Sequence, residues 1–468
     1  MSIYFYKIYK FNILKKMDIY SFSYLPHKSK KLELFKKPIN NIKELKFIFY
    51  DGRCTFFDKI VRLHDNEGKE FIKVYSHLQK LALDLEKIFP DEKIPLLKKG
   101  TRGKKELTRK EVALIFLLSF FNIIDLKQEQ YRDSNAFRVF ELLYCKYEST
   151  FEFGRCFLNY LTIIGKWLSE NNPILEEKIV YIRDTKEFNE NIFEEEQKLC
   201  DIKIIEKGSL FDGDATYGVD FANMYIGGGV LNGGCVQEEI LFAIEPEAIV
   251  SMFFMEVMGD NDAIRIDNTI QYSKYTGYGY NFKYDKSAVD IKDLSTIKKN
   301  KFIAIDASVQ YSGKYGILDK DNIFRDIHKA FVGFNLVNFE ENQNSEDIIE
   351  NKKTEEKVKI LKKKEEKSIG TGNWGCGAFG GDHELKFLQQ WVAASFAGIE
   401  RLDYYTYESK KMKFAIKQLD KIKQKYNNAN ELYQDLINKQ LSEEEVLEIL
   451  LGVNNSEKDD NSLFPFLK

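Results

Sequence analysis

The residues best suited to catalysis are two adjacent glutamates, Glu238 and Glu239, which follow a glycine-rich segment in YIGGGVLNGGCVQEEI (residues 225–240). A carboxyl group can protonate a leaving oxygen and then activate water, which is general acid/base chemistry. Gln237 and the two glutamates are predicted to form the first turn of a helix, where successive side chains point about 100° apart. They are therefore not expected to flank one bond as paired glycosidase carboxylates do, and at most one should act on the cleaved bond. The alternative is that both glutamates only cap the helix.

Two glycine-rich segments are candidates for binding an anion. Gly227, Gly228 and Gly229 belong to the first, and GTGNWGCGAFGGD (residues 370–382) is the second. Each precedes a predicted helix, so its backbone can approach a ligand closely and the N–H groups at the helix start favour negative charge. We predict a pyrophosphate site, with tight turns as the alternative. Neutral N–H donors need no basic patch, which agrees with a net charge of −3.

Other catalytic motifs are missing from the sequence. The second glycine segment matches GxGxxG twice, but the residues before it, KKKEEKS, do not predict the hydrophobic strand that a dinucleotide-binding fold requires. There is no GxxxxGK[ST], HExxH or GxSxG. The five histidines show no paired ligand spacing, so no metal is expected. The six cysteines form no CxxC pair, which argues against a disulfide framework and favours a reducing intracellular compartment.

These residues need a scaffold, and 468 residues with 44% hydrophobic content suffice for two or three domains. Residues 1–200 are predicted to form an N-terminal arm and a mostly helical accessory region. Within it, Thr108 and Glu111 form a TxxE capping box before VALIFLLSFF (residues 112–121), a buried helix too short to span a membrane. The basic stretch at residues 97–110 is expected to be a solvated loop.

Residues 201–468 are predicted to form an α/β catalytic domain, because short β-like runs alternate with helical ones. Strands are expected at residues 202–205, 217–222, 263–266, 301–307 and 402–407. Helices are expected at residues 238–244, 246–254 (started by Pro246), 324–334 and 383–398. A charged segment at about residues 340–368 is predicted to be an inserted surface loop. The tail after Lys411 is predicted to be helical, with an SxxE box at Ser442 and Glu445.

The sequence resembles the poly(ADP-ribose) glycohydrolases over roughly residues 208–407. Five motifs occur in the same order as in that family: VDFANMYIGGGVLNGGCVQEEI (residues 219–240), YTGYGY (275–280), FIAIDA (302–307), KAFVGF (329–334) and TGNWGCGAFGGD (371–382). The resemblance implies an α/β macrodomain-like core, a mixed sheet sandwiched between helices. It further implies cleavage of the ribose–ribose bond of poly(ADP-ribose) to release ADP-ribose, without a cofactor.

By the same resemblance, Glu239 is the general acid/base and Glu238 holds ribose hydroxyls beside the cleaved bond. The other implied substrate contacts are Asn223 near the ribose, Gly227, Gly228 and Gly229 along the diphosphate, Tyr278 closing over the ligand, Gly377, Ala378, Phe379 and Gly380 closing over diphosphate and distal ribose, and Tyr407 stacking on adenine. Gln237 is implied as a further substrate-binding residue. Phe211 stands near the place where the family carries an acidic adenine contact, so the resemblance does not assign that contact to Asp212.

The residues alone leave two other functions open. One is a macrodomain reader that binds ADP-ribose without cleaving it, for which Glu239 would be dispensable. The other is an NAD-dependent oxidoreductase that uses the GxGxxG segment. For the glycohydrolase, the expected partner is poly(ADP-ribose) attached to acceptor proteins. The protein is expected to be a monomer that binds neither nucleic acid nor membranes, located in the cytoplasm or nucleus and linked to the DNA damage response.

Overall fold

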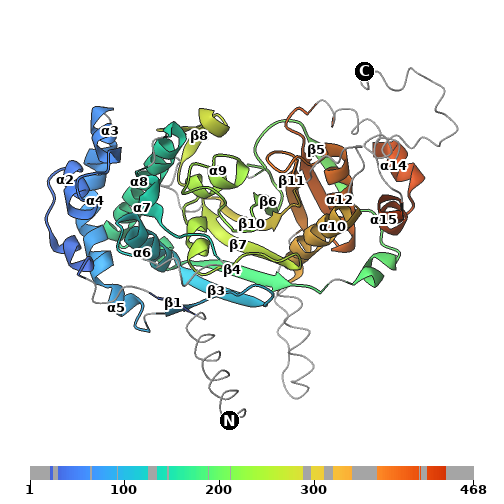
Figure 1. The fold of residues 1–468 in the computed structure, drawn as a ribbon, viewed down its shortest axis with the longest axis horizontal. Coiled ribbons are helices and arrows are strands. Elements are labelled where there is room, and N and C mark those ends of the chain that lie inside the picture. Colours follow the sequence, from blue (N-terminus) through green and yellow to red (C-terminus); the bar gives the residue numbers. More distant parts are fainter. Residues whose placement is uncertain are drawn as a thin grey trace, which may run out of the picture. The chain divides into compact units, whose positions relative to one another are not determined.

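The computed structural model describes residues 22–24, 30–63, 66–91, 93–124, 134–144, 147–187, 189–210, 212–287, 297–309, 320–339, 366–409, 412 and 419–438 (Figure 1). The chain divides into two compact units. The first comprises Met1–Arg183, Ala222–Gly259 and Arg265–Lys301, and the second comprises Asp184–Phe221, Asp260–Ile264 and Phe302–Lys468. Residues beyond 200 therefore contribute to both units.

The first unit is mostly helical in its N-terminal part, as predicted. Its α-helices are α2 (Lys43–Phe49), α3 (Phe56–Arg62), α4 (Glu67–Leu83), α5 (Leu85–Ile88), α6 (Arg109–Phe120), α7 (Val139–Leu142), α8 (Glu148–Ser169) and α9 (Gln237–Ile244), and its 3-10 turns are η1 (Leu32–Lys36), η3 (Pro173–Glu176), η5 (Ala248–Phe253) and η6 (Gly279–Asn281). The capping box of α6 is confirmed, because the N–H of Glu111 donates to Thr108 Oγ1 (3.2 Å) and the N–H of Thr108 donates to Glu111 Oε2 (2.6 Å). Helix α6 is buried almost all round, and α8 packs along α4 (Figure 1).

A mixed eight-stranded sheet has the order β3-β4-β7-β10-β6-β11-β12-β5. Its strands are β3 (Gly103–Thr108), β4 (Lys178–Thr185), β5 (Asp201–Ile205), β6 (Tyr217–Ala222), β7 (Asp262–Ile270), β10 (Lys299–Asp306), β11 (Ser368–Gly372) and β12 (Arg401–Tyr405). All five predicted strands are present. β3 pairs antiparallel with β4, so residues 103–108 of the basic stretch predicted as a loop form a strand. Two short antiparallel ribbons, β1 (Phe22–Tyr24) with β2 (Lys93–Pro95) and β8 (Lys274–Thr276) with β9 (Lys283–Asp285), lie outside this sheet.

In the second unit, strand β11 lies between two parallel neighbours. Ile369 pairs with Leu402 of β12 and with Tyr217 of β6, while Leu402 pairs with Ile202 of β5. The helices of this unit are α10 (Lys320–Asn335), α12 (His383–Phe396), α14 (Leu419–Lys425) and α15 (Ala429–Asn438), with 3-10 turns η4 (Glu190–Glu194) and η7 (Leu336–Asn338). β11 is fully buried, yet its sequence SIGTG carries one large apolar residue. The sequence did not predict it because burial from both sides, not local composition, makes it a strand.

Some local predictions differ from the structure or fall beyond it. The segment after Pro246 is a 3-10 turn beginning at Ala248, not an α-helix started by Pro246. The N-terminal arm, most of the charged insertion, and Ser442 with Glu445 lie outside the described residues. None of the described cysteines is in a disulfide. Over the described parts of the chain, no helix is both long and apolar enough to traverse a bilayer.

Candidate active site

The two glutamates lie at the start of α9, which begins at Gln237 as predicted, and both are buried (2% and 6% exposed). Glu238 accepts hydrogen bonds from the N–H groups of Gly227 (2.7 Å) and Asn223 (2.9 Å). Glu239 accepts them from Gly229 (2.9 Å) and from Val236 (2.9 Å), the residue before the helix. Four backbone donors therefore fix both carboxylates.

Both carboxylates turn toward Gly228, which has a positive φ of 48°. A Cβ at this position would lie 2.5 Å from Glu238 Oε2 and 2.6 Å from Glu239 Oε1. At Gly234 a Cβ would lie 2.7 Å from Glu239 Oε1. Although the two side chains leave the helix in different directions, the loop amides draw their carboxylates to the same glycine. The two carboxylate groups therefore lie closer together than their positions on the helix predict.

The N–H groups of the triple glycine donate to acceptors within the protein, whereas the sequence had predicted an anion beside this loop. Gly227 and Gly229 donate to the two glutamates, and Gly228 donates to the carbonyl of Tyr225 (3.0 Å). The physical reason is that two buried carboxylates need hydrogen-bond donors, and these amides supply two of them. Contact between this loop and a diphosphate stays a prediction.

Asn223, Gln237 and Tyr278 lie beside the glutamates in the same unit. The N–H of Asn223 binds Glu238, and its Oδ1 accepts from the N–H of Tyr225 (3.0 Å). The ring of Tyr278 is 59% exposed, and its phenolic oxygen receives a backbone hydrogen bond from Gln237. Partial burial raises the pKa of Tyr278 above its usual value despite that bond, and the negative charge of Glu239 adds to the rise.

Cys235 also adjoins the glutamates but is unsuited to nucleophilic chemistry. Burial, followed by the charge of Glu239, raises the pKa of its thiol to about 12. Because the thiolate and not the thiol is the nucleophile, this residue stays unreactive near neutral pH.

The β8–β9 hairpin that carries Tyr278 is anchored on α8. Glu152 accepts the N–H of Tyr284 (3.0 Å) and an N–H of Arg155 (3.1 Å). The Arg155 guanidinium lies 4.8 Å from the centre of the Tyr284 ring and donates to Glu67 on α4 (2.5 Å). Helices of the N-terminal region thus position this hairpin.

The second glycine loop lies between β11 and α12 in the second unit. Of its predicted site residues, Gly377, Ala378 and Gly380 are exposed, and Phe379 is half-buried. The N–H of Gly380 donates to the carbonyl of Gly377 (3.1 Å). Since β11 leads into this loop, a strand does precede the second GxGxxG match. The first match, however, places Gly370 and Gly372 inside the strand and not in the turn that the dinucleotide motif requires.

Tyr407 lies close to β11 in the same unit, half-exposed and with a positive φ of 50°. A Cβ at Gly372 would lie 3.2 Å from Tyr407 Cε2, so the glycine lets the two segments approach. A non-glycine residue in this backbone region is uncommon and is often found at functional sites. Asp212 is described, whereas Phe211 lies outside the described residues.

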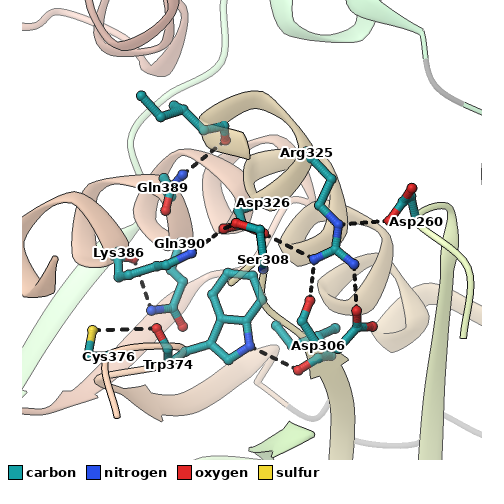
Figure 2. Close-up of polar contacts among 12 residues, drawn as sticks. Asp260, Asp306, Ser308, Arg325, Asp326, Trp374, Cys376, Lys386, Gln389 and Gln390 are labelled. Atoms are coloured by element: carbon teal, nitrogen blue, oxygen red, sulfur yellow. Dashed lines mark hydrogen bonds and ion pairs between the residues drawn. The ribbon is translucent and has the colours of Figure 1, made fainter. Parts of the chain in front are cut away.

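A buried ion network supports the second loop (Figure 2). Asp326 on α10 pairs with Lys386 on α12 and accepts both the N–H (2.9 Å) and the hydroxyl (2.7 Å) of Ser308. Burial opposes ionisation, but Lys386 and the other donors hold the pKa of Asp326 below its usual value. Lys386 Nζ also lies 4.7 Å from the centre of the Trp374 ring, whose Nε1 donates to the carbonyl of Ile305 (2.9 Å).

The same network joins three of the sequence motifs. Asp306 of FIAIDA pairs with Lys329 of KAFVGF (2.6 Å) and with Arg325. Trp374 of TGNWGCGAFGGD rests on Lys386 (Figure 2). These motifs therefore build the support of the second loop.

Sequence reasoning missed Asn135, whose side-chain amide donates to the carbonyl oxygen of Gly228 (2.8 Å). It belongs to no motif, so no local signal marks it. It also missed Gly234, although the NGG triplet before QEE was a signal that the backbone passes close to something there.

Two family models match the chain. Residues 63–183 match the helical domain, and residues 189–414 the macro domain fold, of poly(ADP-ribose) glycohydrolase. The probable poly(ADP-ribose) glycohydrolase 2 of Arabidopsis thaliana is 30% identical over 407 residues, covering 78% of this chain and 77% of the relative. Poly(ADP-ribose) glycohydrolase 1 of the same plant is 31% identical over 320 residues, covering 58% and 57%.

Among solved structures, poly(ADP-ribose) glycohydrolase from Thermomonospora curvata aligns with 13% identity and a TM-score of 0.30, covering 49% of this chain and 81% of that one. The domain matches define the class as a glycosidase with a macrodomain fold preceded by a helical domain. The first Arabidopsis relative extends this similarity over most of both chains. The chain therefore belongs to the poly(ADP-ribose) glycohydrolase family.

Proposed function

We propose that this protein hydrolyses the ribose–ribose O-glycosidic bond of poly(ADP-ribose) and releases ADP-ribose, with Glu239 as general acid/base. The observation that carries the proposal is the position of Glu239. Its buried carboxylate accepts hydrogen bonds from the N–H groups of Gly229 and Val236, and it lies with the carboxylate of Glu238 against Gly228 of the glycine loop.

In this reaction Glu239 acts twice, first as an acid and then as a base. Glu239 donates a proton to the departing 2′-oxygen as the glycosidic bond breaks through an oxocarbenium-like state. The ionised carboxylate then takes a proton from water while the water oxygen bonds to the anomeric carbon, which restores the acid. A negatively charged ligand diphosphate nearby would partly offset the positive charge of the transition state.

Glu238 is suited to bind ribose hydroxyls. Each of its oxygens accepts one backbone N–H, and a carboxylate oxygen can accept more than one hydrogen bond. We assign the remaining contacts as follows: Asn223 and Gln237 to the ribose, Gly227, Gly228 and Gly229 to the diphosphate, Tyr278 to closure over the ligand, Gly377, Ala378, Phe379 and Gly380 to diphosphate and distal ribose, and Tyr407 to the adenine.

The finer biological assignments belong to the same proposal. The substrate would be polymer attached to acceptor proteins, and the enzyme would act as a monomer in the cytoplasm or nucleus, removing polymer made in response to DNA damage. What supports the substrate assignment is the match of this chain to the poly(ADP-ribose) glycohydrolase family models.

The test is Glu239→Gln, which keeps the size of the side chain but removes the acid. A well-placed acid/base contributes about 10²- to 10⁴-fold, so release of ADP-ribose from polymer should fall by at least that range while the affinity for ADP-ribose stays within a few-fold. Glu245→Gln is the control, since it changes a buried glutamate at the other end of α9, and it should leave turnover within about threefold of wild type.

A loss of less than about tenfold in the Glu239→Gln variant would refute the assignment. The wild-type assay separates the other two functions by chromatography of the products. Intact polymer that still binds the protein would favour a reader, and NAD reduced in the presence of metabolites would favour an oxidoreductase.

A further inference from the structure

We propose that Asn135, from the helical region, is a positioning residue for the reaction. Its amide holds two peptide units of the first glycine loop, and each of these units presents its N–H to one of the two glutamates. The inference rests on the proposed function for its kinetic consequence, but the geometry can be tested independently.

The contacts of Asn135 all lie in the first unit. Its Nδ2 donates to the carbonyl oxygens of Gly228 (2.8 Å) and Ile226 (3.2 Å), with a longer contact to that of Tyr225 (3.5 Å). Its Oδ1 accepts the N–H of Ala136 (3.0 Å). Because the loop carbonyls only accept and the Ala136 N–H only donates, the amide has one orientation that satisfies both sides.

The two carbonyls belong to the peptide units that bind the glutamates. The carbonyl of Ile226 and the N–H of Gly227 share one peptide plane, and that N–H donates to Glu238 (2.7 Å). The carbonyl of Gly228 and the N–H of Gly229 share another, and that N–H donates to Glu239 (2.9 Å). In a trans peptide the C=O and N–H point in opposite directions. Asn135 therefore binds the C=O of each peptide unit, while a glutamate accepts the N–H of the same unit.

The flexibility of glycine explains why the loop needs the hydrogen bonds from Asn135. Gly227 and Gly228 have φ values of +87° and +48°, a region that glycine enters freely but does not prefer. Without an outside contact, each peptide plane can rotate away from its carboxylate. A hydrogen bond to the carbonyl also polarises the peptide and strengthens its N–H as a donor. Asn135 thus acts on the glutamates through the backbone, without touching the substrate.

The kinetic test compares Asn135→Ala with Asn159→Ala. Asn159 is a matched control, because its amide is also half-buried and donates to a backbone carbonyl, that of Tyr272 (2.8 Å), away from the glutamates. A misplacement of about 1 Å can lower a rate by about 10²-fold. We expect Asn135→Ala to lower kcat by roughly 10- to 100-fold with ADP-ribose affinity within about threefold of wild type, and Asn159→Ala to leave kcat within about threefold.

Asn135→Asp supplies a second variant of nearly the same shape. It places a carboxylate against the loop carbonyls, so kcat should fall at least as far as in Asn135→Ala. Melting curves fix an assay temperature at which every variant is folded. If kcat in both Asn135 variants stays within about threefold of wild type, or falls no further than in Asn159→Ala, the proposal is overturned.

A direct measurement separates this inference from the proposed function. Hydrogen exchange of the Gly227 and Gly229 amides should speed up by at least about tenfold in Asn135→Ala, while amides within α8 keep their rates. This outcome would support the role of Asn135 in holding the loop even if the Glu239→Gln variant turned out to be active. Unchanged exchange at both glycines in a folded Asn135→Ala protein would overturn the inference even if Glu239→Gln is inactive.

Discussion

At the scale of single residues, the arrangement of the two glutamates depends on glycines, which have no Cβ atom. Gly228 faces one oxygen of each of the two buried glutamates, and the missing Cβ is what allows both carboxylates to approach. The glycines of this loop therefore shape the arrangement of the glutamates. The same loop gives its N–H groups to them, so the backbone acts as the orienting partner that a second side chain supplies in other acid/base sites.

Gly228→Ala should abolish most of the activity. The new methyl group would meet carboxylate oxygens at 2.5 and 2.6 Å, so the glutamates or the loop must move. We expect at least about a 100-fold loss in turnover of poly(ADP-ribose), by the same sensitivity to misplacement.

The control for backbone strain is Gly100→Ala, which has a φ of +71° and no atom within 4 Å of the new Cβ. It should lower the free energy of unfolding by about 1–2 kcal/mol and leave turnover unchanged. If Gly228→Ala kept more than about a tenth of the wild-type rate, steric exclusion at Gly228 would not be what organises the glutamates.

At the scale of elements, two loops of the fold are held by different means. The β8–β9 hairpin is tied to α8 by a carboxylate that accepts a backbone N–H. The second glycine loop packs closely against Lys386. Cβ atoms added at Gly375 and Gly381 would lie only 3.1 and 2.9 Å from its Cε. Lys386 is fully buried and held in place by Asp326 (Figure 2).

Lys386→Met should be strongly destabilising. It retains the apolar stem but leaves Asp326 with one fewer cation in a buried setting, and breaking such a pair typically costs about 3–5 kcal/mol. Urea denaturation followed by circular dichroism would measure this loss.

Lys207→Met provides the comparison, since Lys207 and Glu408 form an exposed pair in the same unit. Exposed pairs contribute about 0–1 kcal/mol, so this variant should unfold close to the wild-type midpoint. Equal effects of the two substitutions would mean that the buried pair does not support the loop.

At the scale of the whole molecule, stability is coupled to pH through Glu245 at the end of α9. Burial raises the pKa of Glu245 to about 7, even though Thr269 and Asn300 donate hydrogen bonds to it. Between its ordinary value of 4.5 and about 7, the native protein keeps a proton that the unfolded chain releases. The free energy of unfolding therefore falls as the pH rises through this interval and levels off above it.

Glu245→Gln should remove this dependence. Glutamine stays neutral and can still bond to Thr269 and Asn300. The difference in stability between variant and wild type should grow from pH 4.5 to pH 7 and reach roughly 3 kcal/mol in favour of the variant by pH 8. Denaturation curves of both proteins at each pH give the difference in the free energy of unfolding. Groups that titrate in the same way in both proteins do not contribute to this difference. A constant difference across this range would show that the native fold does not raise the pKa of Glu245.

Much of the fold, and the place of the two glutamates in it, follow from local sequence patterns. The TxxE box before α6, five strands, the start of α9 at Gln237 and the glutamates after a triple glycine are all set by residues within a few positions of each other. Such patterns act through backbone sterics and short-range hydrogen bonds, which depend little on the rest of the chain.

Only the tertiary structure decided which groups the loop amides bind and what holds the loop. Asn135 and Gly228 are 93 residues apart, so no local pattern links them. β11 became a strand through its two parallel neighbours, and the glycine N–H groups turned inward because buried carboxylates need donors. Burial and long-range hydrogen bonding arise only when distant segments pack together, which is why the start of α9 at the two glutamates was predictable and the hydrogen bonds that hold those glutamates were not.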